Sequence, residues 1–319
     1  MVEAQHLLGD FHFWAETWLK VSTPRLKESS IVKYRNLLHS YIYPQISNRD
    51  ISEIKYNDIS EMCTLLLCKG GKNRQGLSPK TVSSVLSVTK SIIQYASRNN
   101  DISLVSLDCL SVKQPQKPMR ILSQEEQNRL IEYLLNNINT VNLGILLSMH
   151  TGIRIGELCA LTWEDISFQN RMLHIHKTLQ RIQTDYSEGA KTKIVITEPK
   201  SDCSIRNIPL SNEILKILYL NKKNDDAFIL TGKKHYYVEP RNLQNHFKKI
   251  LHSCDIQNVH FHTLRHSFAT RCVENGFDIK SLSEILGHSS VNITLNRYVH
   301  PSMELKRKNM NMISAVLFS

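Results

Sequence analysis

Four segments of the first hundred residues place apolar side chains three or four positions apart, the spacing of an amphipathic helix. Their ends carry helix signals: Ser78 suits an N-cap and Pro79 the first turn, whereas Pro44 cannot continue a helix. The third segment stops before Gly70 and Gly71. The pattern predicts a helical N-terminal unit with helices over residues 5–20, 31–43, 57–68 and 79–99.

This periodicity stops in SVKQPQKPMR, residues 111–120, which contains two prolines and three basic residues. Such a stretch is typical of an extended linker. Helical spacing resumes at SQEE, where Ser123 and Glu126 have the spacing of a capping box for the helix QEEQNRLIEYLLNN. We therefore predict a helical domain over residues 1–110, a basic linker over 111–122 and a second domain over 123–319.

The second domain combines strand and helix patterns. Three stretches alternate or run apolar as strands do: RMLHIHKTLQRIQ, KTKIVITEP and SIRNIPL, with SEG and KSD as turns between them. Helical patterns surround them: VNLGILLSMHT before, and SNEILKILYL, RNLQNHFKKILHSC, HTLRHSFATRCVENG, SLSEILG and SVNITLNRYVH after. The predicted fold class is mainly α, with a helical first domain and a mostly helical second domain that contains a small antiparallel β-sheet.

Composition narrows the choice of partner. The 40 Lys and Arg residues exceed the 29 Asp and Glu residues, the formal net charge is +11, and the pI is near 9.3. This balance indicates a polyanionic partner such as nucleic acid or an anionic surface. The seven cysteines have no CxxC spacing, so we expect free thiols in a reducing compartment. The sequence has no signal-peptide core and no apolar run near the roughly 18 residues of a membrane span. An intracellular protein is expected.

Candidate chemistry gathers in four motifs. HTLRHS places His262, Arg265 and His266 at i, i+3 and i+4 of a predicted helix, and therefore on one face. TGIRIGEL places an arginine near a helix start with a glutamate one turn on, EPKSD places a lysine in a turn, and LGHSSVNITLNRY places a histidine ten residues before a tyrosine. Carboxylates are sparse here, so we expect no metal site and no cofactor. The candidate residues are Arg154, Glu157, Lys200, His262, Arg265, His288 and Tyr298.

This set suits attack on a phosphodiester without a divalent ion. Two guanidinium groups can neutralise the non-bridging oxygens as charge builds on phosphorus. A tyrosine hydroxyl is a weak nucleophile at its free pKa near 10, but surrounding cations favour its ionised form, and its attack gives a covalent phosphotyrosine. A lysine can protonate the departing 5′ oxygen.

Each candidate alone has a simpler structural interpretation. Arg154 with Glu157 at i+3 is by itself an ordinary surface ion pair, and Tyr298 by itself a packing residue. A zinc set of His260, His262 and His266 is disfavoured because a fourth ligand and the usual spacing are missing. Cys63 and Cys68 are expected to be core thiols. Lys191 and Lys193 compete with Lys200 for the lysine role. The joint pattern reverses the individual interpretations.

TGIRIGEL, HTLRHSFAT, LGHSS and NRYVH, in this order and spacing, resemble the tyrosine recombinases of the phage-integrase and Xer family, and conjugative-transposon integrases most of all. The resemblance covers nearly the whole chain, because the N-terminal unit with its LSPKTV helix is similar to the family's core-type DNA-binding domain. It implies that Arg154 and Arg265 clamp the scissile phosphate, with Glu157 supporting Arg154. It further implies the remaining roles: nucleophile Tyr298, general acid Lys200, and phosphate binding or proton transfer by His262 and His288.

The resemblance also implies a biological setting. It predicts a cytoplasmic, nucleoid-associated protein of bacterial or phage origin that binds double-stranded DNA recombination sites as a homo-tetramer. It also predicts 3′-phosphotyrosine and Holliday-junction intermediates, and accessory DNA-bending or directionality proteins. Integrases of this transposon group often carry an N-terminal arm-binding domain, which is not expected here because FHFWAETWL begins near residue 10. The apolar tail MNMISAVLFS is a candidate for docking on a neighbouring protomer or for packing in cis. A type IB topoisomerase, and a DNA-binding regulator on a recombinase scaffold, remain the alternatives.

Overall fold

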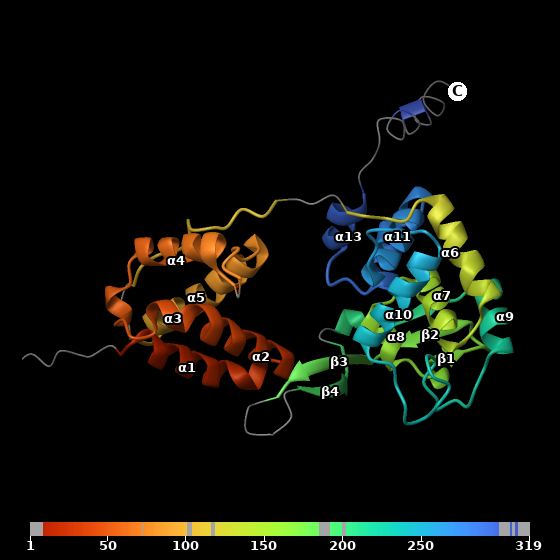
Figure 1. Cartoon of the computed structure of the whole chain (residues 1–319), viewed down its shortest axis with the longest axis horizontal. Helices are drawn as coiled ribbons and strands as arrows, with labels where there is room; N and C mark the ends of the chain where they lie inside the picture. The colour runs from red at the N-terminus through yellow and green to blue at the C-terminus, as the bar shows by residue number, and fades with distance from the viewer. Residues whose placement is uncertain are drawn as a thin grey trace, which may run out of the picture. The chain divides into compact units, whose positions relative to one another are not determined.

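The computed structural model describes residues 9–71, 73–100, 104–115, 119–184, 192–199 and 202–299, together with Arg307, Met310 and Asn311. The chain divides into two compact units (Figure 1). The first comprises Met1–Lys117 with Ile182–Lys193, and the second Pro118–Arg181 with Ile194–Ser319. Most of the tail MNMISAVLFS lies outside the described residues, so its proposed docking remains a prediction.

The first unit is a helical bundle built around α5, which contacts α1, α2 and α4. The buried face of α5 carries Val82, Val85 and Ile92, which pack in one core with Phe11 and Trp14 of α1. Burial of these apolar stripes is the main favourable term that holds such a bundle together. The helices are α1 (Phe11–Ser22), α2 (Glu28–Leu37), α3 (Tyr43–Ile46), α4 (Tyr56–Lys69) and α5 (Pro79–Asn100), with 3₁₀ turns at Thr23–Arg25 and Ile51–Glu53.

Most helix ends lie within three residues of the sequence-based expectation, and two differences are larger. Helix α1 begins at Phe11, because the side chain of Asp10 caps it by accepting a hydrogen bond from the Phe13 amide (2.8 Å). The second helix does not end before Pro44. A π-helical turn, Leu38–Ile42, follows α2 and leads directly into α3, and this places Pro44 in a first helical turn, where its missing N–H costs little.

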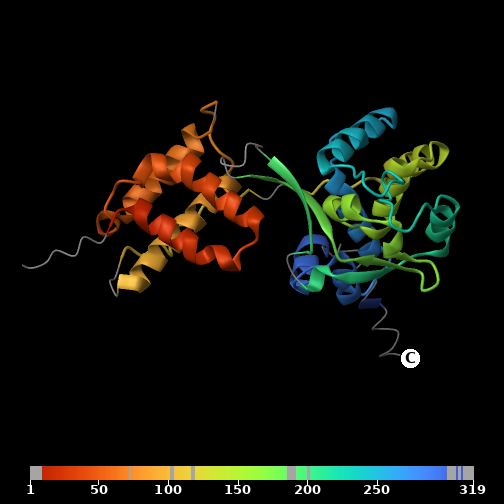
Figure 2. The same ribbon diagram turned by 90° about the horizontal axis from the view of Figure 1, so that it is seen from below.

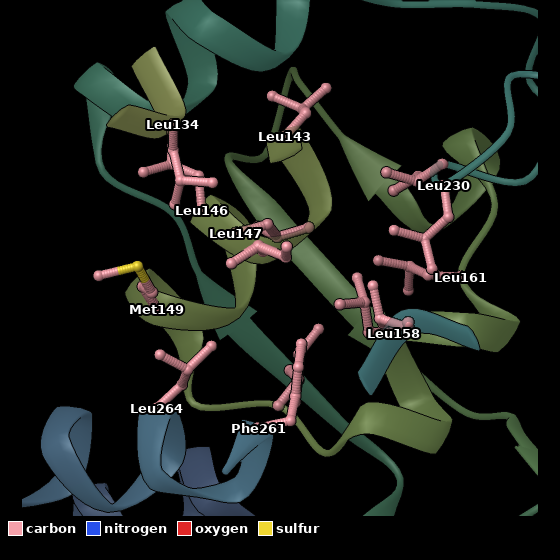
Figure 3. Close-up of a cluster of buried hydrophobic side chains, with 14 of the residues drawn as sticks. Leu134, Leu143, Leu146, Leu147, Met149, Leu158, Leu161, Leu230, Phe261 and Leu264 are labelled. Atoms are coloured by element: carbon pink, nitrogen blue, oxygen red, sulfur yellow. The ribbon is translucent and has the colours of Figure 1, made fainter. Parts of the chain in front are cut away.

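The second unit packs its helices around α7, which contacts α6, α8, α9 and α11. Nine of its twelve residues are buried, so it is apolar on nearly all sides. Figure 3 shows Leu146 and Leu147 of α7 among leucines of neighbouring elements and Phe261 at the start of α11. The helices are α6 (Gln124–Asn136), α7 (Thr140–Thr151), α8 (Ile155–Ala160), α9 (Asn212–Leu220), α10 (Pro240–Ser253), α11 (Phe261–Glu274), α12 (Ile279–Leu286) and α13 (Val291–Tyr298), with a 3₁₀ turn at Trp163–Asp165.

The strands form two small sheets, where the sequence pattern predicted one. Strands β1 (Ile166–Ser167), β2 (Met172–Ile175) and β5 (Arg206–Pro209) pair antiparallel in the order β1-β2-β5, whereas β3 (Thr178–Gln183) pairs with β4 (Thr192–Thr197). The stretch expected as one strand is interrupted between β2 and β3. There the Lys177 ammonium binds Asp165 (3.0 Å) and Thr162 (2.7 Å), which ties the junction to the 3₁₀ turn.

Helices α11, α12 and α13 enclose a small separate core made of Ala269, Cys272, Leu282, Leu286 and Tyr298. In Figure 2, which shows the chain from below, α12 and α13 are the blue helices near its C-terminal end. Two glycines in the left-handed conformation, Gly152 after α7 and Gly287 after α12, end helices at this corner. The C-terminal ends of α7 and α12 therefore meet at this corner.

Other observations concern the chain as a whole. Among the helices that the structure describes, none is both long and apolar enough to cross a membrane. All seven cysteines are free thiols, as expected from their spacing. Cys63 is buried in the first core, whereas Cys68, also expected there, is exposed on α4.

Candidate active site

Three guanidinium groups bind three successive backbone carbonyls at the end of α12. Arg206 Nε donates to the oxygen of residue 285 (2.6 Å), Arg265 Nη2 to that of residue 286 (2.7 Å), and Arg154 Nη2 to that of residue 287 (2.9 Å). The last carbonyls of a helix have no intrahelical partner and carry partial negative charge. The C-terminal turn of α12 therefore holds three cations close together, although they come from α8, β5 and α11.

Glu157 holds the backbone amide and the guanidinium of Arg154. Arg154 is the N-cap of α8, and its amide and Nη1 donate to the two carboxylate oxygens of Glu157 (2.9 and 2.7 Å). Arg206 donates to the same oxygens through Nη1 and Nη2 (3.2 and 2.9 Å). Burial alone would raise the pKa of Glu157, but the hydrogen bonds and charges of both arginines bring it below its ordinary value. The carboxylate is thus ionised and shared between two guanidinium groups.

Arg265 is almost completely buried, with 2% of its side chain exposed. Its Nη1 donates to the carbonyl of Gly152 (2.9 Å), so the αL turn after α7 and the end of α12 hold one guanidinium between them. Burial, with Arg154 nearby, lowers the pKa of Arg265 to about 9. The group therefore stays protonated at neutral pH and can meet an anion there.

Tyr298 ends α13 and is buried, with 4% exposure. Its hydroxyl lies 2.9 Å from Nδ1 of His266, and its ring stacks on that of His288 (centroids 6.3 Å apart, planes at 7°). Burial raises the pKa of Tyr298 above its ordinary value, while Arg265 and Arg297 act in the opposite direction. The cations therefore favour the ionised form, as expected, but in this state burial outweighs them.

Two histidines contact Tyr298, and a third contacts one of them. The rings of His262 and His266, one turn apart on α11, have centroids 4.5 Å apart, and His288 Nδ1 is 2.8 Å from the hydroxyl of Thr294. Burial, followed by neighbouring arginines and histidines, lowers the pKa of each of the three to about 4. All three rings are therefore neutral at pH 7 and can accept a proton or a hydrogen bond.

Six of the seven sequence-predicted residues gather at this corner: Arg154, Glu157, His262, Arg265, His288 and Tyr298. Lys200, the seventh, lies outside the described residues. Sequence reasoning gave no role to Arg206 or to His266. Arg206 had a signal in its position, since it is in phase with Ile208 and Leu210 on the buried face of SIRNIPL. A charged residue at such a position needs a partner.

The zinc alternative finds no support at this site. Among the residues with described positions, no three His, Cys, Asp or Glu side chains are grouped so that they could hold a metal ion. His260 instead precedes α11 as its N-cap. His262 and His266 lie beside arginines, which disfavour a bound cation.

Comparison with known proteins gives the family. The profile described as the phage integrase family matches residues 120–304, and that of the phage integrase N-terminal SAM-like domain matches residues 10–66. A tyrosine recombinase XerC-like protein of Caldanaerobacter subterraneus subsp. tengcongensis is 27% identical, over 92% of this chain and 79% of that protein. The transposase of transposon Tn916 from Enterococcus faecalis is also 27% identical, over 60% of this chain and 52% of that protein.

Solved structures share the fold. The Tn1549 transposon integrase, in complex with a circular intermediate DNA, has a TM-score of 0.75 at 21% identity, covering 94% of this chain and 99% of that one. A lambda integrase tetramer bound to a Holliday junction has a TM-score of 0.63 at 16% identity, covering 88% and 78%. The first family profile alone matches more than half of the chain. The chain therefore belongs to the phage integrase family, and it is a tyrosine-type site-specific recombinase related to the conjugative-transposon integrases.

Proposed function

We propose that this recombinase cuts and rejoins DNA of a mobile element with Tyr298 as the nucleophile and with Arg154 and Arg265 as the phosphate clamp. The observation that carries the proposal is the convergence at the end of α12. Both clamp arginines bind adjacent carbonyls there, and Arg265 is among the charges that act on the Tyr298 hydroxyl. A phosphate beside that hydroxyl would meet both cations.

In this mechanism the Tyr298 oxygen forms a bond to phosphorus while the bond from phosphorus to the 5′ oxygen breaks. The hydroxyl loses its proton and the 5′ oxygen gains one, so that a 3′-phosphotyrosine and a 5′-hydroxyl end result. Arg154 and Arg265 neutralise the non-bridging oxygens during the step, a task otherwise given to Mg²⁺. Attack by a 5′-hydroxyl end of the other duplex then reverses the chemistry and exchanges the strands.

The neighbouring groups support this step. Glu157, held by Arg206, orients Arg154, and we propose that His262 and His288 hydrogen-bond the phosphate beside the tyrosine. His288 is fixed by Thr294, which leaves Nε2 as its second nitrogen for a ligand. These roles explain why neutral imidazoles lie among cations.

Lys200 is proposed as the general acid that protonates the 5′ oxygen. Of its two rivals, Lys193 forms an ion pair with Glu28 (2.8 Å), both in the first unit, while Lys191 lies outside the described residues. Lys200→Ala should cut normal DNA slowly but cut a substrate with sulfur at the 5′ bridging position at nearly the wild-type rate, because a thiolate leaves without a proton. Lys191→Ala and Lys193→Ala are the matched controls. If the Lys200→Ala substitution lowered the cleavage rate of both substrates by the same factor, Lys200 would not be the general acid.

The main test uses a suicide substrate, a recombination site nicked near the cut so that the covalent complex cannot reverse. Wild-type protein should form a covalent adduct at Tyr298, with or without a chelator, and Tyr298→Phe should form none while still binding DNA. Arg154→Gln and Arg265→Gln should slow adduct formation by about 10²–10³-fold, the loss typical of a charge-stabilising group. An adduct with Tyr298→Phe, or its loss in chelator, contradicts the proposal.

Two experiments separate the alternatives. Strand exchange that needs two matching sites distinguishes a recombinase from a type IB topoisomerase. DNA binding with no adduct from the wild-type protein would instead favour a regulator.

We also infer the assembly. Because the solved lambda integrase is a tetramer on a Holliday junction, we propose that four copies of this chain bind two recombination sites, with domains 1–110 and 123–319 both contacting DNA through the chain's positive charge. Accessory DNA-bending or directionality proteins and a nucleoid location belong to the same proposal.

A further inference from the structure

The Tyr298 hydroxyl contacts a residue that the mechanism above does not use. His266 Nδ1 lies 2.9 Å from it, within hydrogen-bond distance, and the two rings have centroids 5.8 Å apart. Helix α11 carries His266 one residue after Arg265 and one turn after His262, and the packing of α13 against α11 brings Tyr298 to it. The nucleophile thus meets an imidazole nitrogen in the folded protein, with 4% of its own surface exposed.

Burial makes this contact chemically important. A phenol that attacks phosphorus must lose its proton, and a general base must lie within hydrogen-bond reach of that proton. The neighbouring groups are poorly suited. Arg265 and Arg297 can only donate, and His288 Nδ1 is engaged with the Thr294 hydroxyl. His262 lies against the ring of His266, and no hydrogen bond joins it to Tyr298 among the described contacts.

We propose that His266 is a further catalytic residue, the general base that takes the Tyr298 proton during strand cleavage. With its ring proton on Nε2, Nδ1 accepts the hydroxyl proton as the oxygen–phosphorus bond forms and the bond to the 5′ oxygen breaks. The imidazolium returns the proton to the tyrosine oxygen when a 5′ hydroxyl attacks the phosphotyrosine. The proposal rests on Tyr298 being the nucleophile.

The surroundings explain why the transfer needs the DNA. His266 faces His262 and Arg265 on α11, His288 after α12, and Arg297 and Tyr298 on α13, and burial with these neighbours keeps its pKa near 4. Before DNA arrives, the imidazole is neutral and the phenol keeps its proton. A bound phosphate adds negative charge that favours the imidazolium, and bond formation to phosphorus makes the phenol proton acidic. Proton transfer and attack therefore occur together.

Two substitutions separate basicity from hydrogen bonding. His266→Asn keeps an amide acceptor near the position of Nδ1 but cannot take a proton at neutral pH, whereas His266→Ala removes both functions. Each should form the adduct with the suicide substrate about 10²–10⁴-fold more slowly than wild type, the range typical of general-base catalysis. His252→Asn, on the exposed side of α10, is the matched control and should cleave like wild type.

A fluorinated tyrosine at position 298 gives a readout that a structural role would not move. Fluorination lowers the phenol pKa, so the reaction depends less on a base, and the loss caused by His266→Asn should shrink. The proposal is overturned if His266→Asn slows cleavage by the same factor with tyrosine and with fluorotyrosine, or if His266→Asn cleaves at the wild-type rate. Both results can be read even if His266→Ala fails to fold. An adduct with Tyr298→Phe would instead overturn the proposed nucleophile, so the two failures are distinguishable.

Discussion

Arg206 illustrates how one buried charge supports another. Its guanidinium and the Glu157 carboxylate are 6% and 3% exposed, and they pair at 2.9 Å. Arg206→Gln leaves the carboxylate with fewer partners in a buried site, and loss of one member of such a pair typically costs about 3–5 kcal/mol. We expect the free energy of unfolding from urea titration to fall by that amount.

The matched control for this substitution is Arg181→Gln. Its partner Glu239 lies at 2.5 Å, but the two side chains are 45% and 26% exposed. An exposed pair contributes at most about 1 kcal/mol, so this variant should remain close to wild type. If both variants lost the same free energy of unfolding, burial of the Arg206 pair would not add to its contribution to stability.

Gly287 is needed for two reasons, and a second glycine separates them. Both Gly287 and Gly276 have positive φ (63° and 78°), but an added Cβ at Gly287 would lie 3.1 Å from Arg206 Cδ and Nη1, whereas at Gly276 nothing lies within 4 Å. Gly276→Ala should cost only the backbone strain, about 1 kcal/mol. Gly287→Ala should cost more in the urea titration and should also slow adduct formation, because it displaces Arg206. Equal effects of the two variants would contradict this.

Single residues were predictable where a motif carried them and unpredictable where only folding brings them together. The seven candidates came from four short motifs, and six of them lie at one corner. Arg206 lies in the segment EPKSDCSIRNIPL that supplied Lys200, but no role was predicted for it, and its pairing with Glu157 spans 49 residues of sequence. The contact of His266 with Tyr298 depends on how α13 packs on α11, which no local pattern fixes.

At the scale of elements, the first half of α11 and the turn after α12 make the second unit sensitive to acid. The three histidines there titrate near pH 4 in the folded state and near 6.5 when unfolded. Between these values the unfolded chain binds more protons, so the free energy of unfolding falls as pH decreases from 6.5 toward 4.

The measurement is urea unfolding of wild type and His266→Asn at several pH values between 7 and 4. Carboxylates titrate in both proteins. The difference between the two plots of unfolding free energy against pH therefore reports the contribution of His266. Wild type should lose stability more steeply with falling pH than the variant. Parallel curves would mean that His266 has the same pKa in both states.

Element boundaries were predictable where a side chain caps the backbone. The capping box of Ser123 and Glu126 starts α6 as expected, with bonds of 2.8 and 3.1 Å. The π turn before α3 was not predictable, because the local rule that proline ends a helix ignores a widened turn. The break between β2 and β3 depends on Lys177 reaching Asp165, a tertiary contact.

At the scale of the molecule, the net charge of +11 should govern DNA affinity through counterion release. The logarithm of the association constant should fall linearly with the logarithm of salt concentration. Arg154→Gln removes one proposed phosphate contact and should reduce the slope by about 1, as measured by fluorescence anisotropy. Arg49→Gln removes a charge that the paired Asp58 already offsets, so it serves as the comparison and should change the slope less. An unchanged slope for Arg154→Gln would remove it from the phosphate contacts.

The sequence also predicted the family and the order of helices, but not the grouping of the hairpin. Residues Ile182–Lys193, between the last part of β3 and the start of β4, belong to the first unit although their neighbours in sequence belong to the second. A single domain boundary in the sequence cannot assign an internal segment to the other unit. The alternation of apolar residues predicts a strand, but it does not predict which unit that strand belongs to.

Because three arginines bind one short turn, the position of that turn sets the positions of all three guanidinium groups together. Positions 154, 206 and 265 are distant in sequence, yet each is tied to a neighbouring carbonyl of residues 285–287. A displacement of this turn by about the length of a hydrogen bond would move all three guanidinium groups out of position. It would also move His288, which follows the turn directly. If Arg154 and Arg265 bind the scissile phosphate as proposed, the protein would lose its phosphate-binding cations together and not one at a time.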